Sequence, residues 1–167
     1  YTGCLTFNDI ELFDVSIEVR DTHCEDGVHF TRVRGNIKYL LVHNSAFDGL
    51  DADFSNLTFD RMLIKNAGND CIDFSGGNYL VRSALLENCG DKGVSAGEES
   101  IVSLNDVKIA NALVAIVAKD SSYLTGEEII AKNVRLCSAA YRKKQEFGSG
   151  INKLDSFYCS TDTFYQQ

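Results

Sequence analysis

The fold is decided by a short pattern that returns along the chain with a 22-residue spacing: Asp48-Gly49-Leu50-Asp51-Ala52 is followed, one period later, by Asp70-Cys71-Ile72-Asp73-Phe74. Each copy alternates apolar and variable positions, which is the pattern of a half-buried β-strand. The same spacing gives Asp26-Gly27-Val28-His29-Phe30, Lys92-Gly93-Val94-Ser95-Ala96 and Val114-Ala115-Ile116-Val117-Ala118. A weaker sixth copy, Ser138-Ala139-Ala140-Tyr141-Arg142, is predicted to follow a two-residue insertion.

A second column of the repeat consists of asparagines, each preceded by apolar residues at strand-like spacing. Asn tolerates the left-handed backbone region, and its amide can bond to an identical amide in the next repeat. We therefore expect a ladder of asparagines at one tight bend of every repeat. The column contains Asn44, Asn66 and Asn88, and then, after a one-residue slip, Asn111 and Asn133.

Short strands with a fixed Asn corner favour a β-solenoid, since neither a leucine-rich pattern nor a helical repeat period is present. The predicted fold class is all-β: a right-handed parallel β-helix, or single-stranded β-solenoid, of about six 22-residue coils. We expect residues 1–167 to form one such domain. Because the chain opens with Tyr1 and has no initiator Met, we also expect it to be a piece of a larger protein.

Composition excludes several partner classes. The net charge of −8 disfavours nucleic acid, because an acidic surface repels phosphate backbones. The acidity is concentrated in residues 1–75, which hold 13 Asp/Glu and 6 Lys/Arg, so a cation is a plausible partner there. No apolar run reaches the length of a membrane span. The usual short catalytic motifs of hydrolases, phosphate-binding loops and zinc proteases are also absent.

Five stretches of the repeat stand out as motifs: Phe47 to Ser55, Gly68 to Gly76, Asp91 to Glu98, Ala118 to Ser121 and Ala140 to Lys144. They resemble motifs of a bacterial family of right-handed parallel β-helix repeat proteins with a pectate-lyase-like fold. The resemblance covers about residues 25–148 and implies the fold. Relatives of that fold include polysaccharide lyases, hydrolases and epimerases, as well as non-catalytic binding modules, so the fold does not choose a function.

Acidic residues are predicted to crowd the outward side of two adjacent coils. If Val28 and Phe30 point inward, His29 points outward, and the residues stacked on it are Asp51, Asp73, Ser95, Val117 and Tyr141. Like-charge stacking is expected to raise the pKa values of these carboxyl groups. The candidate metal ligands, with Ca²⁺ as the possible cofactor, are Asp48, Asp51, Asp53, Asp70 and Asp73.

The same cluster carries the candidate catalytic residues, Asp51, Asp73 and His29. One carboxyl group would stay protonated as general acid while its neighbour is ionised. The alternative interpretation is a solvated acidic face whose Asp side chains cap turns. Lys92, Lys119 and Lys143, with Lys144 and Arg142 nearby, are candidate substrate-binding residues for a uronate carboxylate, or else partners that neutralise the stacked acids.

The six cysteines include one pair, Cys137 and Cys159, separated by one coil period. Stacked residues lie at roughly 4.8 Å, within the Cα range of a disulfide of about 4.4–6.8 Å. A bridge would fasten the last coil, although in a cytoplasmic protein both thiols would stay reduced. The sequence leaves these two states open.

The leading functional hypothesis is a module without catalysis that binds a carbohydrate or a protein surface, in an extracellular or cell-surface protein. The alternative hypothesis is a polysaccharide-active lyase or hydrolase that acts on an acidic glycan through the Asp51/Asp73 face. The tight coil period favours the first, because enzymes of this fold wall their clefts with long loop insertions.

Overall fold

The computed structural model describes residues 2–161, which form parallel strands and no helix. In this described part, no helix has the length and hydropathy that a membrane span requires. The strands are β1 (Gly3–Asn8), β2 (Glu11–Thr22), β3 (Asp26–Thr31), β4 (Arg34–Ser45), β5 (Asp48–Phe59), β6 (Met62–Ala67), β7 (Ile72–Val81), β8 (Ala84–Cys89), β9 (Lys92–Gly97), β10 (Ile101–Lys119), β11 (Tyr123–Tyr141) and β12 (Ile151–Thr161).

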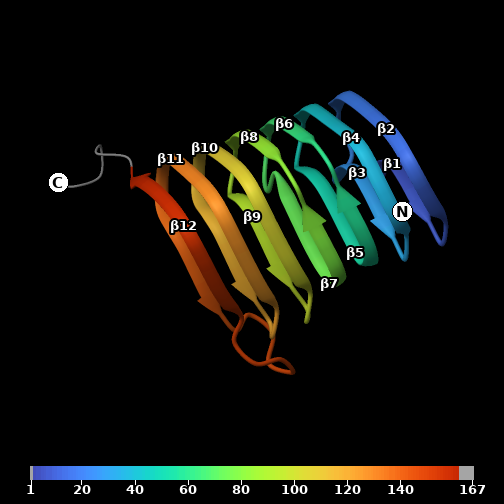
Figure 1. Cartoon of the computed structure of the whole chain (residues 1–167). Helices are drawn as coiled ribbons and strands as arrows, with labels where there is room; N and C mark the ends of the chain where they lie inside the picture. Colours follow the sequence, from blue (N-terminus) through green and yellow to red (C-terminus); the bar gives the residue numbers. More distant parts are fainter. Residues whose placement is uncertain (1, 162–167) are drawn as a thin grey trace.

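The strands wind into a solenoid of about six coils, and Figure 1 shows the coils side by side in chain order from β1 and β2 to β12. Each coil contributes one stretch to each of three faces. The first face contains residues 26–31, 48–53, 72–75, 92–97 and 114–119. The second contains residues 34–37, 56–59, 78–81, 101–104 and 123–126. The third contains residues 40–45, 62–67, 84–89, 107–112 and 129–134.

The predicted fold class is confirmed by the register of these strands. Leu50 pairs with Ile72, which pairs with Val94, so each step along the column is one period of the repeat. The apolar positions of the repeat form the core, because every second side chain of a first-face strand points inward. All the predicted inward residues are fully buried: Val28, Phe30, Leu50, Ala52, Ile72, Phe74, Val94, Ala96, Ile116 and Ala118.

The asparagine ladder is also present as predicted. Asn66 has a positive φ of 58° and donates its amide hydrogen to Asn44 Oδ1 at 2.8 Å, while it accepts from Asn88 Nδ2 at 2.7 Å. Asn111 and Asn133 extend the ladder into the later coils. At the N-terminal end of the ladder, Asn44 donates to the Asp21 carboxylate. The ladder fixes one corner of each coil from Asp21 to Asn133.

Two details of the predicted register are wrong. Ile116 pairs with Ser138 and Lys119 with Tyr141, so no insertion precedes Ser138. Ala139, and not Tyr141, therefore lies beside Val117. The extra residues come later, in the loop 142–150, since Tyr123 pairs with Ile151, which is more than one period further along the chain. The fully buried Asp120 anchors that loop by accepting the backbone N–H groups of Lys143 and Lys144.

The N-terminal stretch is a coil in its own right, because β1 pairs with β3 and β2 with β4. Residues 1 and 162–167 of the single domain expected from the sequence lie outside the described residues.

All six cysteines form disulfides: Cys4–Cys24, Cys71–Cys89 and Cys137–Cys159. The possible bridge between Cys137 and Cys159 is thus confirmed, but its geometry differs from simple stacking. Cys159 pairs in register with Ala131, because the loop 142–150 shifts the last strand. The bridge therefore links different faces of the last two coils, with Cα atoms 5.9 Å apart.

Replacing Asn66 by alanine should lower the free energy of unfolding by about 2 kcal/mol. The change removes two amide hydrogen bonds and places a Cβ-bearing residue without a polar side chain in the left-handed region, which costs about 1–2 kcal/mol. Urea denaturation measures the effect. Asn66→Gly is the matched control, because glycine lacks the same ladder bonds but adopts this backbone freely. Equal stability of Asn66→Ala and the unmodified chain would contradict the ladder's role.

Thiol titration of the denatured, unreduced protein should detect no free thiol, and six after full reduction. The Cys71→Ala/Cys89→Ala double variant should lose about 3 kcal/mol of unfolding free energy, since the closed loop spans 18 residues. Four or six free thiols in the unreduced protein would rule out this pairing.

Candidate functional site

The predicted acidic residues stack on the first face as the repeat requires. His29 pairs with Asp51, Asp51 with Asp73, and Asp73 with Ser95. The face differs from the expected solvated surface, however. Ser95 and Val117 are almost fully buried, and His29 is 8% exposed. Asp51, Asp53 and Asp73 are half-buried. The charges on this face therefore need partners within the protein.

His29 lies at the centre of one such network. Its Nδ1 atom is 3.2 Å from Asp26 Oδ2 and its Nε2 atom is 3.1 Å from Asp53 Oδ2. Hydrogen bonds to Asp26 and Asp53 outweigh the effect of burial and raise the pKa of His29 to about 10. At neutral pH the imidazole is charged and donates from both nitrogens, so it has no lone pair for a metal or for base catalysis.

Two of the predicted metal ligands cap turns instead. Asp48 Oδ1 accepts the backbone N–H of Asp70 at 2.8 Å and the Asn69 amide at 2.7 Å. Asp70 Oδ1 accepts the backbone N–H of Lys92 at 3.0 Å. Each carboxylate thus holds the equivalent turn of the next coil, one period further along the chain.

Burial is the first cause of the raised carboxyl pKa values, ahead of the like-charge stacking predicted from the sequence. It raises the pKa of Asp51 to about 8, with further contributions from Asp53, Asp26 and Asp73. It raises the pKa of Asp70 to about 7, although Lys92 acts in the opposite direction. The pKa of Asp48 is also raised by burial, against the hydrogen bonds from Asp70 and Asn69. Asp51 is therefore mostly protonated at pH 7.

The predicted lysines do not gather at one place on the surface. Burial alone would lower the pKa of Lys92, but its ion pairs with Asp91 and with Asp70, at 3.2 Å, raise it. Lys119 reaches two coils back to Asp73, at 3.5 Å. Its stem crosses Gly97, where a Cβ would lie 2.7 Å from the Lys119 Cε atom. Lys143 is exposed in the loop 142–150.

One group of side chains has the spacing of a metal site: Asp26, His29 and Asp51 each place one ligand atom within 4.8 Å of the others. A cation would have to displace protons from both His29 and Asp51, because both hold them at neutral pH. A hard cation such as Ca²⁺ also prefers six to eight oxygen ligands. The group therefore fits a proton-dependent salt-bridge network better than a calcium site.

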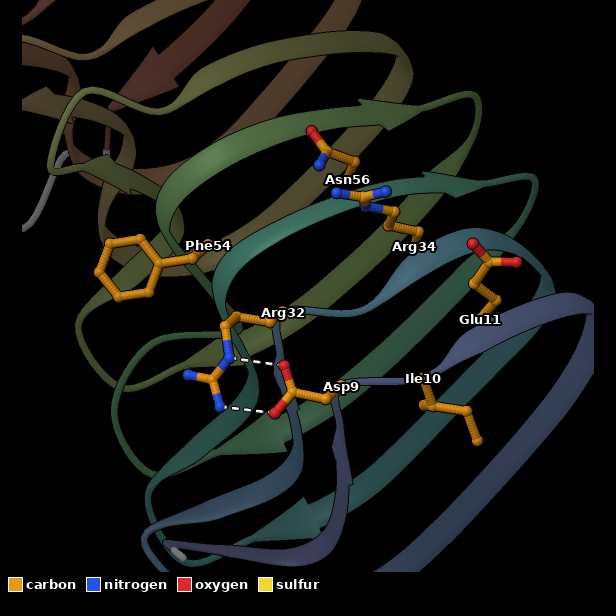
Figure 2. Close-up of a pocket in the computed structure, with 7 residues that line it drawn as sticks. All are labelled: Asp9, Ile10, Glu11, Arg32, Arg34, Phe54 and Asn56. Atoms are coloured by element: carbon orange, nitrogen blue, oxygen red, sulfur yellow. Dashed lines mark hydrogen bonds and ion pairs between the residues drawn. The ribbon is translucent and has the colours of Figure 1, made fainter.

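The second face carries a surface feature that the sequence patterns did not single out. A depression of about 510 Å³ is lined by Asp9, Ile10, Glu11, Arg32, Arg34, Phe54 and Asn56, and we call it the arginine depression. In Figure 2, Asp9 and Arg32 face one another across two contacts, with Phe54 to one side. Arg32 donates from Nε to Asp9 Oδ1 at 2.6 Å, which lowers the pKa of Asp9.

Phe54 and Arg34 present free surface to this depression. Phe54 is 58% exposed, and its ring lies against Gly76, where a Cβ would come within 2.6 Å of the ring. Arg34 is exposed and forms no hydrogen bond or ion pair through its side chain with another residue in the range 2–161. An aromatic ring and an unpaired guanidinium on a rigid sheet are groups that bind polar ligands.

An adjoining depression of about 340 Å³ shares Asn56 with the first, and we call it the asparagine depression. It is lined by Asn56, Leu57, Thr58, Asn78, Tyr79, Leu80, Ile101 and Ser103. Asn78 donates its amide to Asn56 Oδ1 at 2.7 Å. The two depressions share Asn56 and lie on neighbouring coils along the second face, and we call them together the trough. The 22-residue spacing already placed Arg34, Asn56 and Asn78 in one column, but only two of the three share a residue type, so the column did not stand out in the sequence.

Stability should fall steadily as pH rises from about 4 to 10. Between pH 4 and 8 the unfolded chain has released the Asp51 proton while the folded chain retains it, so rising pH favours unfolding; Asp70 acts likewise up to pH 7. The His29 contribution is complete below pH 6.5 and is lost as pH rises through 10. Each titrating group contributes a slope of up to about 1.4 kcal/mol per pH unit, measurable by urea denaturation across the range.

Asp51→Asn is the matched variant for this pH profile, because its neutral amide resembles the protonated acid. It should remove the Asp51 contribution to the slope between pH 5 and 8, and leave the Asp70 contribution up to pH 7 and the His29 contribution at higher pH. An unchanged slope would show that Asp51 ionises normally in the folded chain.

Comparison of the chain with family models, with curated proteins and with solved structures finds no match. The fold thus stands as a parallel β-solenoid of about six turns, without an assigned family.

Proposed function

We propose that this chain is a non-catalytic carbohydrate-binding module of the pectate-lyase-like β-helix group. The observation that supports the proposal is the trough on the second face, formed by the arginine and asparagine depressions around Asn56. It combines amide and guanidinium donors with an exposed aromatic ring. Sugars offer hydroxyl groups at the ring edge and apolar C–H groups on the ring face, so they match such a mixed lining.

The trough lies on a scaffold that holds its side chains in place. Arg34, Asn56 and Asn78 are register partners in successive coils. The strands that carry them are also held outside the trough, since β5 pairs with β7 on the first face and β4 pairs with β6 on the third. A preorganised site loses little conformational entropy on binding, which favours shallow recognition of a flexible polymer.

Binding is favoured over catalysis by the state of the candidate catalytic pair. Asp73 forms an ion pair with Lys119, whose stem covers Gly97 and whose side chain is almost buried. The protonated Asp51 would suit a general acid. Both carboxyl groups are half-buried and Asp73 is paired with Lys119, whereas Arg34, Asn56 and Asn78 in the trough are exposed.

The three disulfides support a place outside the reducing cytoplasm. We propose that the chain belongs to an exported protein, at the cell surface or in the extracellular space. A binding module with covalently fastened coils would retain its fold there.

Screening the chain against a glycan array, with and without Ca²⁺, should reveal polysaccharide binding that does not require the cation. Arg34→Ala and Asn56→Ala should each weaken binding about fivefold, the loss of roughly one hydrogen bond. Lys132→Ala, an exposed change on the third face, is the control and should bind normally. Release of sugar fragments during the assay would favour the enzyme hypothesis, and no binding to any glycan would contradict the proposal and favour a protein partner.

A further inference from the structure

The trough is electrically balanced within an acidic protein. In the arginine depression, Asp9 and Glu11 are matched by Arg32 and Arg34. Two hydrogen bonds, of 2.6 and 2.7 Å, join Arg32 to Asp9, and Glu11 is the register partner of Arg34. The formal charges of this depression sum to zero, against −8 for the whole chain.

The asparagine depression contains no acidic or basic side chain. Its one titratable group, the Tyr79 hydroxyl, turns inward and donates to the backbone oxygen of Ala52 at 2.8 Å. Burial raises the pKa of Tyr79 above its usual value, so the group remains neutral. The trough as a whole therefore offers hydrogen bonds and apolar surface without a net charge.

An acidic polymer would gain little from this surface. The trough supplies no excess positive charge to match a row of carboxylates, and the net charge of −8 repels such a polymer at a distance. Of the lysines that might have matched carboxylates, Lys92 and Lys119 pair with Asp70, Asp73 and Asp91 on or beside the first face, and Lys143 lies in the loop 142–150. An uncharged polymer meets neither penalty.

The spare polar atoms of the trough fit hydroxyl groups. Asn56 Nδ2 and Asn78 Oδ1 have no hydrogen-bond partner among residues 2–161, while the bond between the two amides fixes both side chains. One is a donor and the other an acceptor, and a hydroxyl group can satisfy either. Beyond them the same column continues with Ile101, 53% exposed, and Tyr123, 39% exposed.

The column also sets the direction of the ligand. Its members lie one coil apart, at roughly 4.8 Å, along the solenoid axis. A chain that lies along the axis contacts the guanidinium of Arg34, then the two amides, then the apolar side chains of Ile101 and Tyr123. A chain that crosses the coils at right angles would contact one of these groups at most.

We propose that the ligand of the trough is an uncharged polysaccharide that lies parallel to the solenoid axis, over Arg34, Asn56, Asn78, Ile101 and Tyr123. The inference rests on the proposed function and narrows it, because the proposed function leaves the charge of the glycan open. Hydroxyl groups bond to the amides, and sugar ring faces pack on Ile101 and Tyr123.

Affinity electrophoresis or calorimetry of the whole chain tests this with neutral polymers (a β-glucan, a xylan and a mannan) and acidic ones (polygalacturonate and alginate), at low and at high salt. At least one neutral polymer should bind, with an affinity that changes less than about twofold with salt, because no ion pair is involved. The acidic polymers should bind at least about tenfold more weakly at low salt.

The Asn56→Ala/Asn78→Ala variant should lose about tenfold or more in affinity for the neutral polymer, and Ile101→Ala several-fold. Lys132→Ala on the third face is the matched control, and circular dichroism with thermal melting checks that each variant folds. Salt-sensitive binding to acidic polymers alone, abolished by Arg34→Ala, would overturn this inference but leave the binding module intact. Binding to neither class would overturn both.

Discussion

Parallel stacking in register is the constraint on which the rest of this structure depends. Each residue lies about 4.8 Å from its equivalents in the coils on either side. The size, polarity and charge of a side chain must therefore be compatible with those of the side chains stacked on it. Apolar residues satisfy this readily, as the fully buried column from Val28 through Leu50 and Ile72 to Ile116 shows. Amides satisfy it by bonding to one another, as in the asparagine ladder.

Charged side chains can stack in register only where side chains of opposite charge at neighbouring positions neutralise them. The stacked carboxylates of the first face are compensated by His29 at one end and by Lys92 and Lys119 at the other. Where compensation is incomplete, as at Asp51, the carboxyl group retains its proton. This accounts for a face that is acidic in sequence and is nevertheless largely closed to solvent. The proposed binding trough lies instead on the second face, where the acidic and basic side chains of the arginine depression balance.

The repeat made the architecture predictable, since a regular 22-residue period with alternating apolar positions has few other solutions. The 22-residue spacing alone predicted the column from His29 to Asp73 and the asparagine ladder. The last coil did not, because Ser138 and Ala140 are poor matches to the apolar pattern and the true insertion lies in the loop 142–150. That error misplaced Tyr141.

The candidate site was less predictable than the fold. Ion pairs such as Lys119–Asp73 depend on side chains that reach across two coils, which spacing does not reveal. The trough could not be predicted from the sequence, because the residue type of its column changes at almost every coil. A column can be recognised in a sequence only where the same type of side chain recurs at the repeat spacing.

The ion pair between Lys119 and Asp73 also affects how the chain unfolds. A simple solenoid couples each coil only to the next, so it can fray one coil at a time from its ends. The Lys119–Asp73 contact couples coils that are not adjacent, with Ser95 and Gly97 enclosed between them. Releasing any one of these three coils disturbs the other two. The middle of the solenoid should thus open as one cooperative block, protected in hydrogen exchange as a unit, between ends that open more locally.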